Sequence, residues 1–144
     1  MAAKPKQKAL AAGPALIRAA TAVTEEYERI SSELGLTMQQ ARLLFVLHRQ
    51  PTNMLGLGSA LRLTKSTMTG VVARMEAAGL VVRVPDETDR RNFVVTPTER
   101  GAQVAEEFER LLRTEVRRML QVLDPAERDT LADLLSTVIA AHEN

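Results

Sequence analysis

Residues 63–96 read LTKSTMTGVVARMEAAGLVVRVPDETDRRNFVVT, and this stretch decides the fold. Its first half places apolar residues at steps of three and four: Met68, Val71, Val72 and Met75. This spacing predicts an amphipathic helix over 65–79, with Thr64 as its N-cap and Gly79 at its C-terminal end. The second half has two β-branched runs on either side of a polar tip over 85–92, which predicts a β-hairpin.

Helical patterns precede and follow this stretch. Apolar residues recur at helical spacing over 9–34, and Thr37 with Gln40 forms a capping-box sequence that opens a second helix. A short third helix is expected over 54–61, and two further helices are expected over 98–144. The predicted order is four helices, a hairpin and two helices in one domain spanning 1–144. The fold is therefore expected to be mainly α with a small β-hairpin.

Composition excludes several classes of protein. The chain has no cysteine, so disulfides and thiolate chemistry are absent, and its two histidines, His48 and His142, lack a carboxylate at a metal-ligand spacing. We find no arrangement of Ser, His and Asp and no phosphate loop, so we expect neither an enzyme nor a cofactor. No apolar run approaches the roughly 18 residues of a membrane span, and the N-terminus lacks the apolar stretch of a secretory signal. We expect a cytoplasmic protein.

The near-zero net charge conceals a strong segregation of charge. The formal sum is +1, yet no acid occurs over 34–75, a segment with five Lys and Arg residues. Residues 96–144 hold six arginines against ten acids. A basic central segment between more acidic helices is typical of a surface that binds phosphates. On charge alone, chance clustering on a solvated face explains the pattern equally well.

The order of short helix, turn, amphipathic helix and hairpin matches a winged helix-turn-helix. The exposed face of helix 65–79 is expected to be small or basic, and an α-helix of this kind fits the major groove of double-stranded DNA. We expect Ser66, Thr67 and Thr69 to contact bases, and Thr64, Lys65 and Arg74 to hold phosphates. An ordinary surface helix would carry interleaved acids, but none occurs here before Glu76.

The tip over 85–92 supplies a second candidate DNA contact. Arg90 and Arg91 lie where a wing would reach the minor groove, whose negative potential attracts arginine. Asp89 is expected to orient one of them, and which arginine enters the groove stays open. The three acids of the tip weaken its positive field, so a solvated turn is an equally good interpretation of this segment alone.

With these features the sequence resembles the MarR family of bacterial transcription regulators. Leu63-Thr64-Lys65-Ser66-Thr67-Met68-Thr69 is similar to the start of that family's recognition helix, and Asp89-Arg90-Arg91 followed by Thr98-Glu99-Arg100-Gly101 is similar to its wing signature. The resemblance implies a homodimer with dimerisation helices over 9–34 and 98–144 and a DNA-binding lobe over 37–96. It also implies a palindromic operator and, most commonly, repression.

The same resemblance suggests release from DNA by a small aromatic or anionic effector. Arg42, His48 and Arg49 are candidate contacts for an anion, although a surface or capping role is commoner for such residues. The chain has one tyrosine, three phenylalanines and no tryptophan, so an aromatic pocket would be poorly furnished. Two alternatives remain: a constitutive DNA-binding protein without a ligand, and a winged-helix protein-interaction module.

Overall fold

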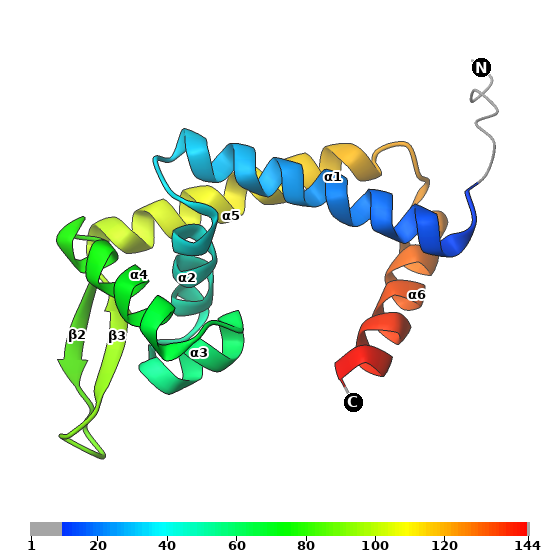
Figure 1. The fold of residues 1–144 in the computed structure, drawn as a ribbon. Helices are drawn as coiled ribbons and strands as arrows, with labels where there is room; N and C mark the ends of the chain where they lie inside the picture. The colour runs from blue at the N-terminus through cyan, green and yellow to red at the C-terminus, as the bar shows by residue number, and fades with distance from the viewer. Residues whose placement is uncertain (1–9, 144) are drawn as a thin grey trace. The chain divides into compact units, whose positions relative to one another are not determined.

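The computed structural model describes residues 10–143, and its elements follow the predicted order (Figure 1). The chain divides into two compact units, Met1–Leu112 and Arg113–Asn144. The elements of the described residues are α1 (Ala12–Glu33), α2 (Met38–Arg49), β1 (Thr52–Asn53), α3 (Met54–Leu61), α4 (Lys65–Ala77), β2 (Val81–Pro85), β3 (Phe93–Pro97), α5 (Glu99–Leu120) and α6 (Pro125–Glu143). The mainly α fold with a hairpin is confirmed, whereas the boundaries 9–34, 37–96 and 98–144 of the functional segments stay predictions.

The sheet contains one strand that the sequence analysis missed. β1 is only two residues long and pairs with β3, where Thr52 faces Val95 and Asn53 faces Val94. The three strands are antiparallel in the order β1-β3-β2. A strand of two residues is too short to show an alternating pattern, so only its pairing partner far along the chain defines it.

The predicted helix caps are present. The Gln40 backbone N–H donates to Thr37 Oγ1 at 3.3 Å, and the Thr37 N–H donates to Gln40 Oε1 at 2.9 Å, which completes the capping box of α2. Thr64 caps α4 by accepting from the Thr67 N–H at 3.3 Å. After α4, Gly79 takes a φ of 71°, a left-handed conformation that glycine adopts without a steric cost.

The core of the first unit forms around α2 and α4. Met68, Val71, Val72 and Met75 are all buried, as the stripe in the sequence predicts. The α1 and α5 helices join this core through Tyr27 and Phe108, whose rings meet edge to face with centroids 4.6 Å apart. The winged helix is thus held against both long helices of its unit.

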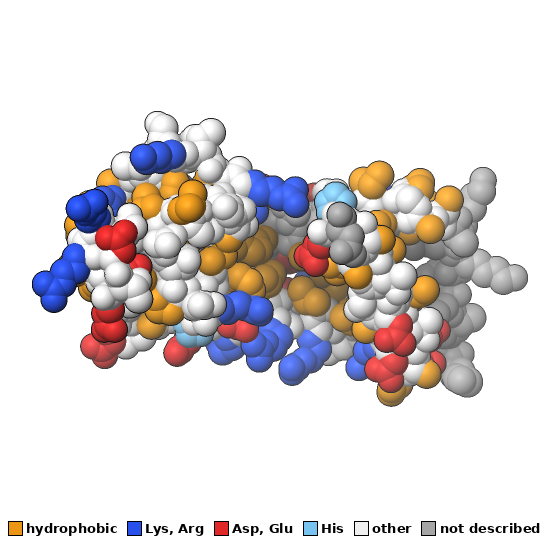
Figure 2. All heavy atoms as spheres, turned by 90° about the horizontal axis from the view of Figure 1, so that it is seen from below, with side chains coloured by type: hydrophobic (Ala, Val, Ile, Leu, Met, Phe, Trp, Pro, Cys, Tyr) orange, Lys and Arg blue, Asp and Glu red, His pale blue; other side chains and the backbone are white. Residues whose placement is uncertain are grey.

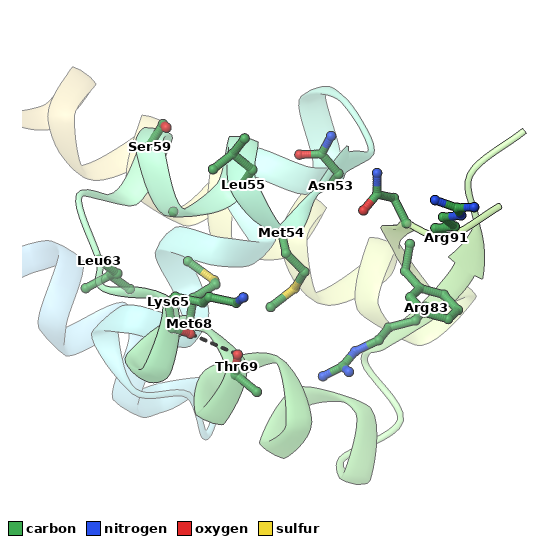
Figure 3. Close-up of a pocket in the computed structure, with 13 residues that line it drawn as sticks. Asn53, Met54, Leu55, Ser59, Leu63, Lys65, Met68, Thr69, Arg83 and Arg91 are labelled. Atoms are coloured by element: carbon green, nitrogen blue, oxygen red, sulfur yellow. Dashed lines mark hydrogen bonds between the residues drawn. The ribbon is translucent and has the colours of Figure 1, made fainter. Parts of the chain in front are cut away.

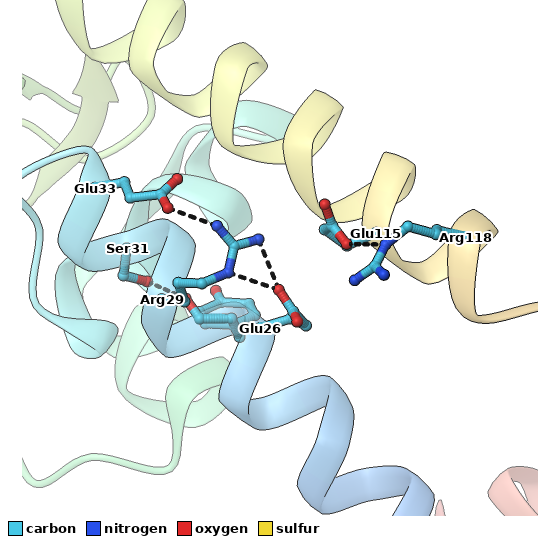
Figure 4. Close-up of polar contacts among 7 residues, drawn as sticks. Glu26, Arg29, Ser31, Glu33, Glu115 and Arg118 are labelled. Carbon is cyan, nitrogen blue, oxygen red and sulfur yellow. Dashed lines mark hydrogen bonds and ion pairs between the residues drawn. The ribbon is translucent and has the colours of Figure 1, made fainter.

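Surface ion pairs link neighbouring turns of the long helices (Figure 4). On α1, the Arg29 guanidinium bridges Glu26 Oε2 at 2.7 Å and Glu33 Oε1 at 2.6 Å. In the second unit, Arg118 Nε lies 2.7 Å from Glu115 Oε2 on α5. Exposed pairs of this kind contribute little to stability, so the helices depend on what their apolar faces contact.

α6, in the second unit, leaves most of its large apolar side chains exposed. None of the described residues Pro125–Glu143 is buried, and Leu134 and Ile139 are 62% and 55% exposed. Asp124 and Glu127 cap its start reciprocally, with N···O distances of 2.9 and 2.8 Å. Among the described residues, no helix combines the length and apolar character that a membrane crossing requires.

Candidate nucleic-acid interface

Every predicted contact residue of α4 lies on the solvent side of the helix. The four apolar residues of the stripe face the core, and this rotation exposes the opposite face. The exposed residues include all six that the sequence analysis selected: Thr64, Lys65, Ser66, Thr67, Thr69 and Arg74. The face is cationic and rich in hydroxyl groups, and its first acidic residue is the half-buried Glu76.

The hydroxyl groups of this face differ in what they can still bind. Thr64 Oγ1 and Thr67 Oγ1 lie 2.9 Å apart, so these two hydroxyls share one hydrogen bond. Thr69 Oγ1 donates to the Lys65 carbonyl at 2.8 Å, which leaves only its acceptor capacity and its methyl group for a partner. The Ser66 hydroxyl has no hydrogen-bond partner among residues 10–143, so it can both donate and accept.

The tip between β2 and β3 is shaped by its own acidic residues. Asp86 Oδ1 accepts from the Thr88 hydroxyl at 2.7 Å and from its N–H at 2.8 Å, and these bonds lower the pKa of the Asp86 carboxyl. Asp89 accepts from the Arg91 N–H at 3.1 Å and from Asn92 Nδ2 at 2.9 Å. Asp89 therefore holds the backbone of Arg91, and the side chains of Arg90 and Arg91 are exposed.

A groove of about 750 Å³ lies between α3, α4 and the hairpin (Figure 3). Lys65 and Thr69 line it from α4, and Arg91 lines it from the tip. Arg83, on β2, also lines it and was missed by the sequence analysis, although it is the only charged residue in a β-branched run. Arg83 Nε is 3.2 Å from Glu76 Oε2, an ion pair without hydrogen-bond geometry.

Figure 2 shows one face of the molecule, with basic and acidic side chains over the winged-helix part and hydrophobic side chains between them. Among residues 10–143, Asp86 and Asp89 form no ion pair with Arg90 or Arg91 and instead accept hydrogen bonds within the loop. A mixed but locally basic surface of this kind can attract phosphates while the loop keeps its shape.

A second cavity, of about 460 Å³, lies among α1, α2 and α3. Tyr27, Phe45 and Arg42 line it. The single tyrosine and one of the three phenylalanines thus lie at the same pocket, although the low aromatic content gave little reason to expect an aromatic pocket. Burial raises the pKa of Tyr27 to about 12, although the nearby Arg42 charge opposes this shift. The pocket therefore offers a neutral phenol beside a guanidinium.

Only one of the three candidate anion contacts reaches this pocket. Arg42 lines it, whereas the Arg49 guanidinium lies 4.7 Å from the centroid of the Phe45 ring and His48 Nε2 lies 4.0 Å from Glu109 Oε2. Among residues 10–143, His, Asp and Glu side chains nowhere gather in a group of three that could hold a metal ion.

Comparisons with known proteins point to one family. A family model described as "MarR family" matches residues 34–92. The transcriptional regulator FarR of Neisseria gonorrhoeae is 28% identical over 122 residues, which are 84% of this chain and 84% of that protein.

Two solved structures show the same fold. The transcriptional repressor CouR bound to a 23-mer DNA duplex is 26% identical, with a TM-score of 0.73 and coverage of 90% of this chain and 92% of that one. NadR in complex with 4-hydroxyphenylacetate is 25% identical, with a TM-score of 0.72 and coverage of 94% and 96%.

Proposed function

We propose that this chain is a winged-helix transcription regulator of the MarR family, which binds a palindromic operator as a homodimer and represses transcription. Its α4 helix enters the major groove and its wing, residues 85–92, follows the minor groove. The observation that carries this proposal is the solvent-facing side of α4, where cations and hydroxyl groups are exposed and no acid precedes Glu76. Such a face suits base edges and phosphates.

The side chains of α4 divide into two roles. Ser66, Thr67 and Thr69 discriminate bases, and the unpartnered hydroxyl of Ser66 is the most adaptable of the three because it can donate or accept. Thr64, Lys65 and Arg74 hold phosphates and fix the register of the helix on the duplex. Phosphate contacts also carry most of the salt dependence.

The wing adds contacts next to the recognition helix. Arg90 and Arg91 reach the minor groove, and Asp89 stabilises the loop that presents them through the Arg91 N–H. Arg83 lines the groove between α4 and the wing, where its guanidinium is paired with Glu76 at 3.2 Å.

Dimerisation is supported by the uncovered apolar side chains of α6. Leu134, Val138 and Ile139 are all more than half exposed, and a second copy of the chain would bury them. A symmetric dimer would also place two recognition helices about 34 Å apart, one turn of DNA. This spacing is what a palindromic operator requires.

The cavity lined by Tyr27, Phe45 and Arg42 is the proposed effector site. Its guanidinium and its two aromatic rings suit a small aromatic acid, and the NadR structure holds a ligand of that type. Such an effector would release DNA to the extent that it binds a non-binding arrangement of the dimer more tightly. An Arg42→Gln variant that keeps its DNA affinity but still responds fully to 4-hydroxyphenylacetate would remove Arg42 from this site.

We also propose that the protein is a regulator without catalytic activity and works in the cytoplasm, where bacterial DNA lies. The relatives named above support this, since they are transcriptional regulators or repressors. A constitutive DNA-binding protein would share every contact of α4 and the wing and differ only by lacking a response to ligands.

Selection of bound fragments from genomic DNA tests the proposal. The full chain should enrich a short palindrome whose half-site centres are about 10 base pairs apart. A Ser66→Ala variant should select a degenerate version of the same site. The matched control is Ser136→Ala on α6, whose hydroxyl donates within its own helix to the Ala132 carbonyl at 2.7 Å. Enrichment of no common sequence by the unsubstituted protein would overturn the proposal.

A further inference from the structure

The end of α4, the base of the hairpin and the start of α5 meet at one point. β2 begins and β3 ends here, where Val81 pairs with Pro97. The backbone N–H of Thr98 donates to the Leu80 carbonyl at 3.1 Å, directly beside that pair. We call this contact region the α4–α5 joint; it consists of Ala78, Gly79 and Leu80 on one side and Thr98, Arg100 and Gly101 on the other.

The Thr98 hydroxyl lies at the centre of the joint and uses both of its hydrogen-bonding capacities. It donates to the Gly79 carbonyl at 2.7 Å, and it accepts from the Gly101 N–H at 3.0 Å. The acceptor role caps α5, as a threonine before a helix ordinarily does. The donor role is separate, because it reaches a residue 19 positions earlier in the chain and fixes the end of α4.

The backbones of the joint are in close contact. Gly101 is buried, and a Cβ atom at this position would overlap the Leu80 carbonyl oxygen. Arg100 Nη1 adds a long hydrogen bond of 3.4 Å to the Ala78 carbonyl. The first turn of α5 therefore touches the chain that leaves α4 without a side chain between them.

We propose that Thr98 is a positioning residue for DNA recognition: its hydroxyl locks the end of α4 to the start of α5 and so sets the direction of the recognition helix. This inference rests on the proposed function, because it concerns a dimer that reads two half-sites. Both DNA-contacting elements are attached to the joint: α4 ends at it, and the two strands that carry the wing begin and end at it. Loss of the lock would let α4 adopt several directions.

Three variants separate the two roles of the hydroxyl. Thr98→Ser keeps the donor and the acceptor. Thr98→Val has nearly the same volume but neither function. Thr98→Asp keeps a good acceptor for the cap of α5 but cannot donate to the Gly79 carbonyl. The control is Thr21→Val, which removes a hydroxyl that donates at 3.0 Å to the Ile17 carbonyl of its own helix.

The test measures affinity for duplexes that carry the selected half-sites at the preferred spacing and at spacings one or two base pairs shorter and longer. The ratio of affinities within one protein cancels any uniform change in charge. For Thr98→Val and Thr98→Asp, the preference for the correct spacing should fall about fivefold, the factor that corresponds to one net hydrogen bond. Thr98→Ser and Thr21→Val should keep the preference of the unsubstituted protein.

Hydrogen exchange without DNA supplies a second measurement. The amides of residues 78–80 should exchange faster in Thr98→Val and Thr98→Asp than in Thr98→Ser. Thr98→Asp is informative even if Thr98→Val fails to fold, because its helix cap is intact. A Thr98→Asp protein with unchanged spacing preference or unchanged exchange would show that only the cap matters and would overturn the inference.

Failure of this inference can be told apart from failure of the proposed function. If the unsubstituted protein binds all spacings equally, then it is not a dimeric reader of two half-sites and the proposed function fails. If it prefers one spacing and the Thr98 variants keep that preference, only the positioning role of Thr98 fails.

Discussion

Replacement of Arg91 by alanine should flatten the salt dependence of DNA binding. The Arg91 backbone N–H stays available to Asp89 in the alanine variant, so the loop keeps its hydrogen bond and only the guanidinium is lost. A dimer loses two such groups, one from each protomer. Since each phosphate contact contributes about 0.9 to the slope of log affinity against log salt, the slope should fall by about 1.8.

This change in slope has a measurable consequence. Between about 50 mM and about 200 mM salt, the advantage of the unsubstituted protein over Arg91→Ala should shrink about twelvefold. Fluorescence anisotropy with one labelled duplex at several salt concentrations measures it. Arg91→Lys keeps the charge and should restore the slope, and Arg18→Ala, which removes an exposed cation of α1, should leave it unchanged. Unchanged slopes for both Arg91→Ala and Arg90→Ala would refute a wing in contact with DNA.

Three further predictions concern assembly, ionisation and backbone strain. Alanine at Leu134 or Ile139 should raise the dissociation constant of the dimer about 30-fold, as measured by sedimentation, because each of the two copies loses about 1 kcal/mol of stabilisation from apolar burial. An unsubstituted protein that sediments as a monomer would contradict this prediction. Tyr27 is the single tyrosine, so absorbance at 295 nm should show only about a tenth of it ionised at pH 11, against about nine tenths in urea. The free energy of unfolding should fall as the pH rises from about 10 to about 12, because the unfolded chain loses the Tyr27 phenol proton at a lower pH than the folded protein. A titration midpoint of Tyr27 near pH 10 in the folded protein would contradict its burial. Arg62 has a φ of 52°, so Arg62→Gly should raise the free energy of unfolding by about 0.5 kcal/mol, whereas Arg62→Ala should not; denaturant titration decides.

The parts of the fold that depend on local signals were predictable. The stripe from Met68 to Met75 identified α4 and its buried face, and Thr37 with Gln40 identified the start of α2. These signals involve residues within one or two turns of each other, where spacing alone determines which side chains meet. The exposure of the candidate contact residues on α4 follows from the same periodicity.

Features that depend on distant parts of the chain were not predictable. β1 exists only through its pairing with β3, and the groove residue Arg83 gains its position from the packing of β2 beside α4. The hydrogen bond from Thr98 to the Gly79 carbonyl links residues that no local pattern connects. Composition also made an aromatic pocket look improbable, because it could not reveal that Tyr27 and Phe45 line the same cavity.

In the proposed complex, a pair of α4 helices reads the DNA sequence. The most direct measurement compares the affinity of the full chain for a duplex with the selected palindrome and for a scrambled duplex of the same length and composition at one salt concentration. If the α4 helices read sequence, the protein should prefer the palindrome by at least about a thousandfold. Equal affinities for the two duplexes would contradict it.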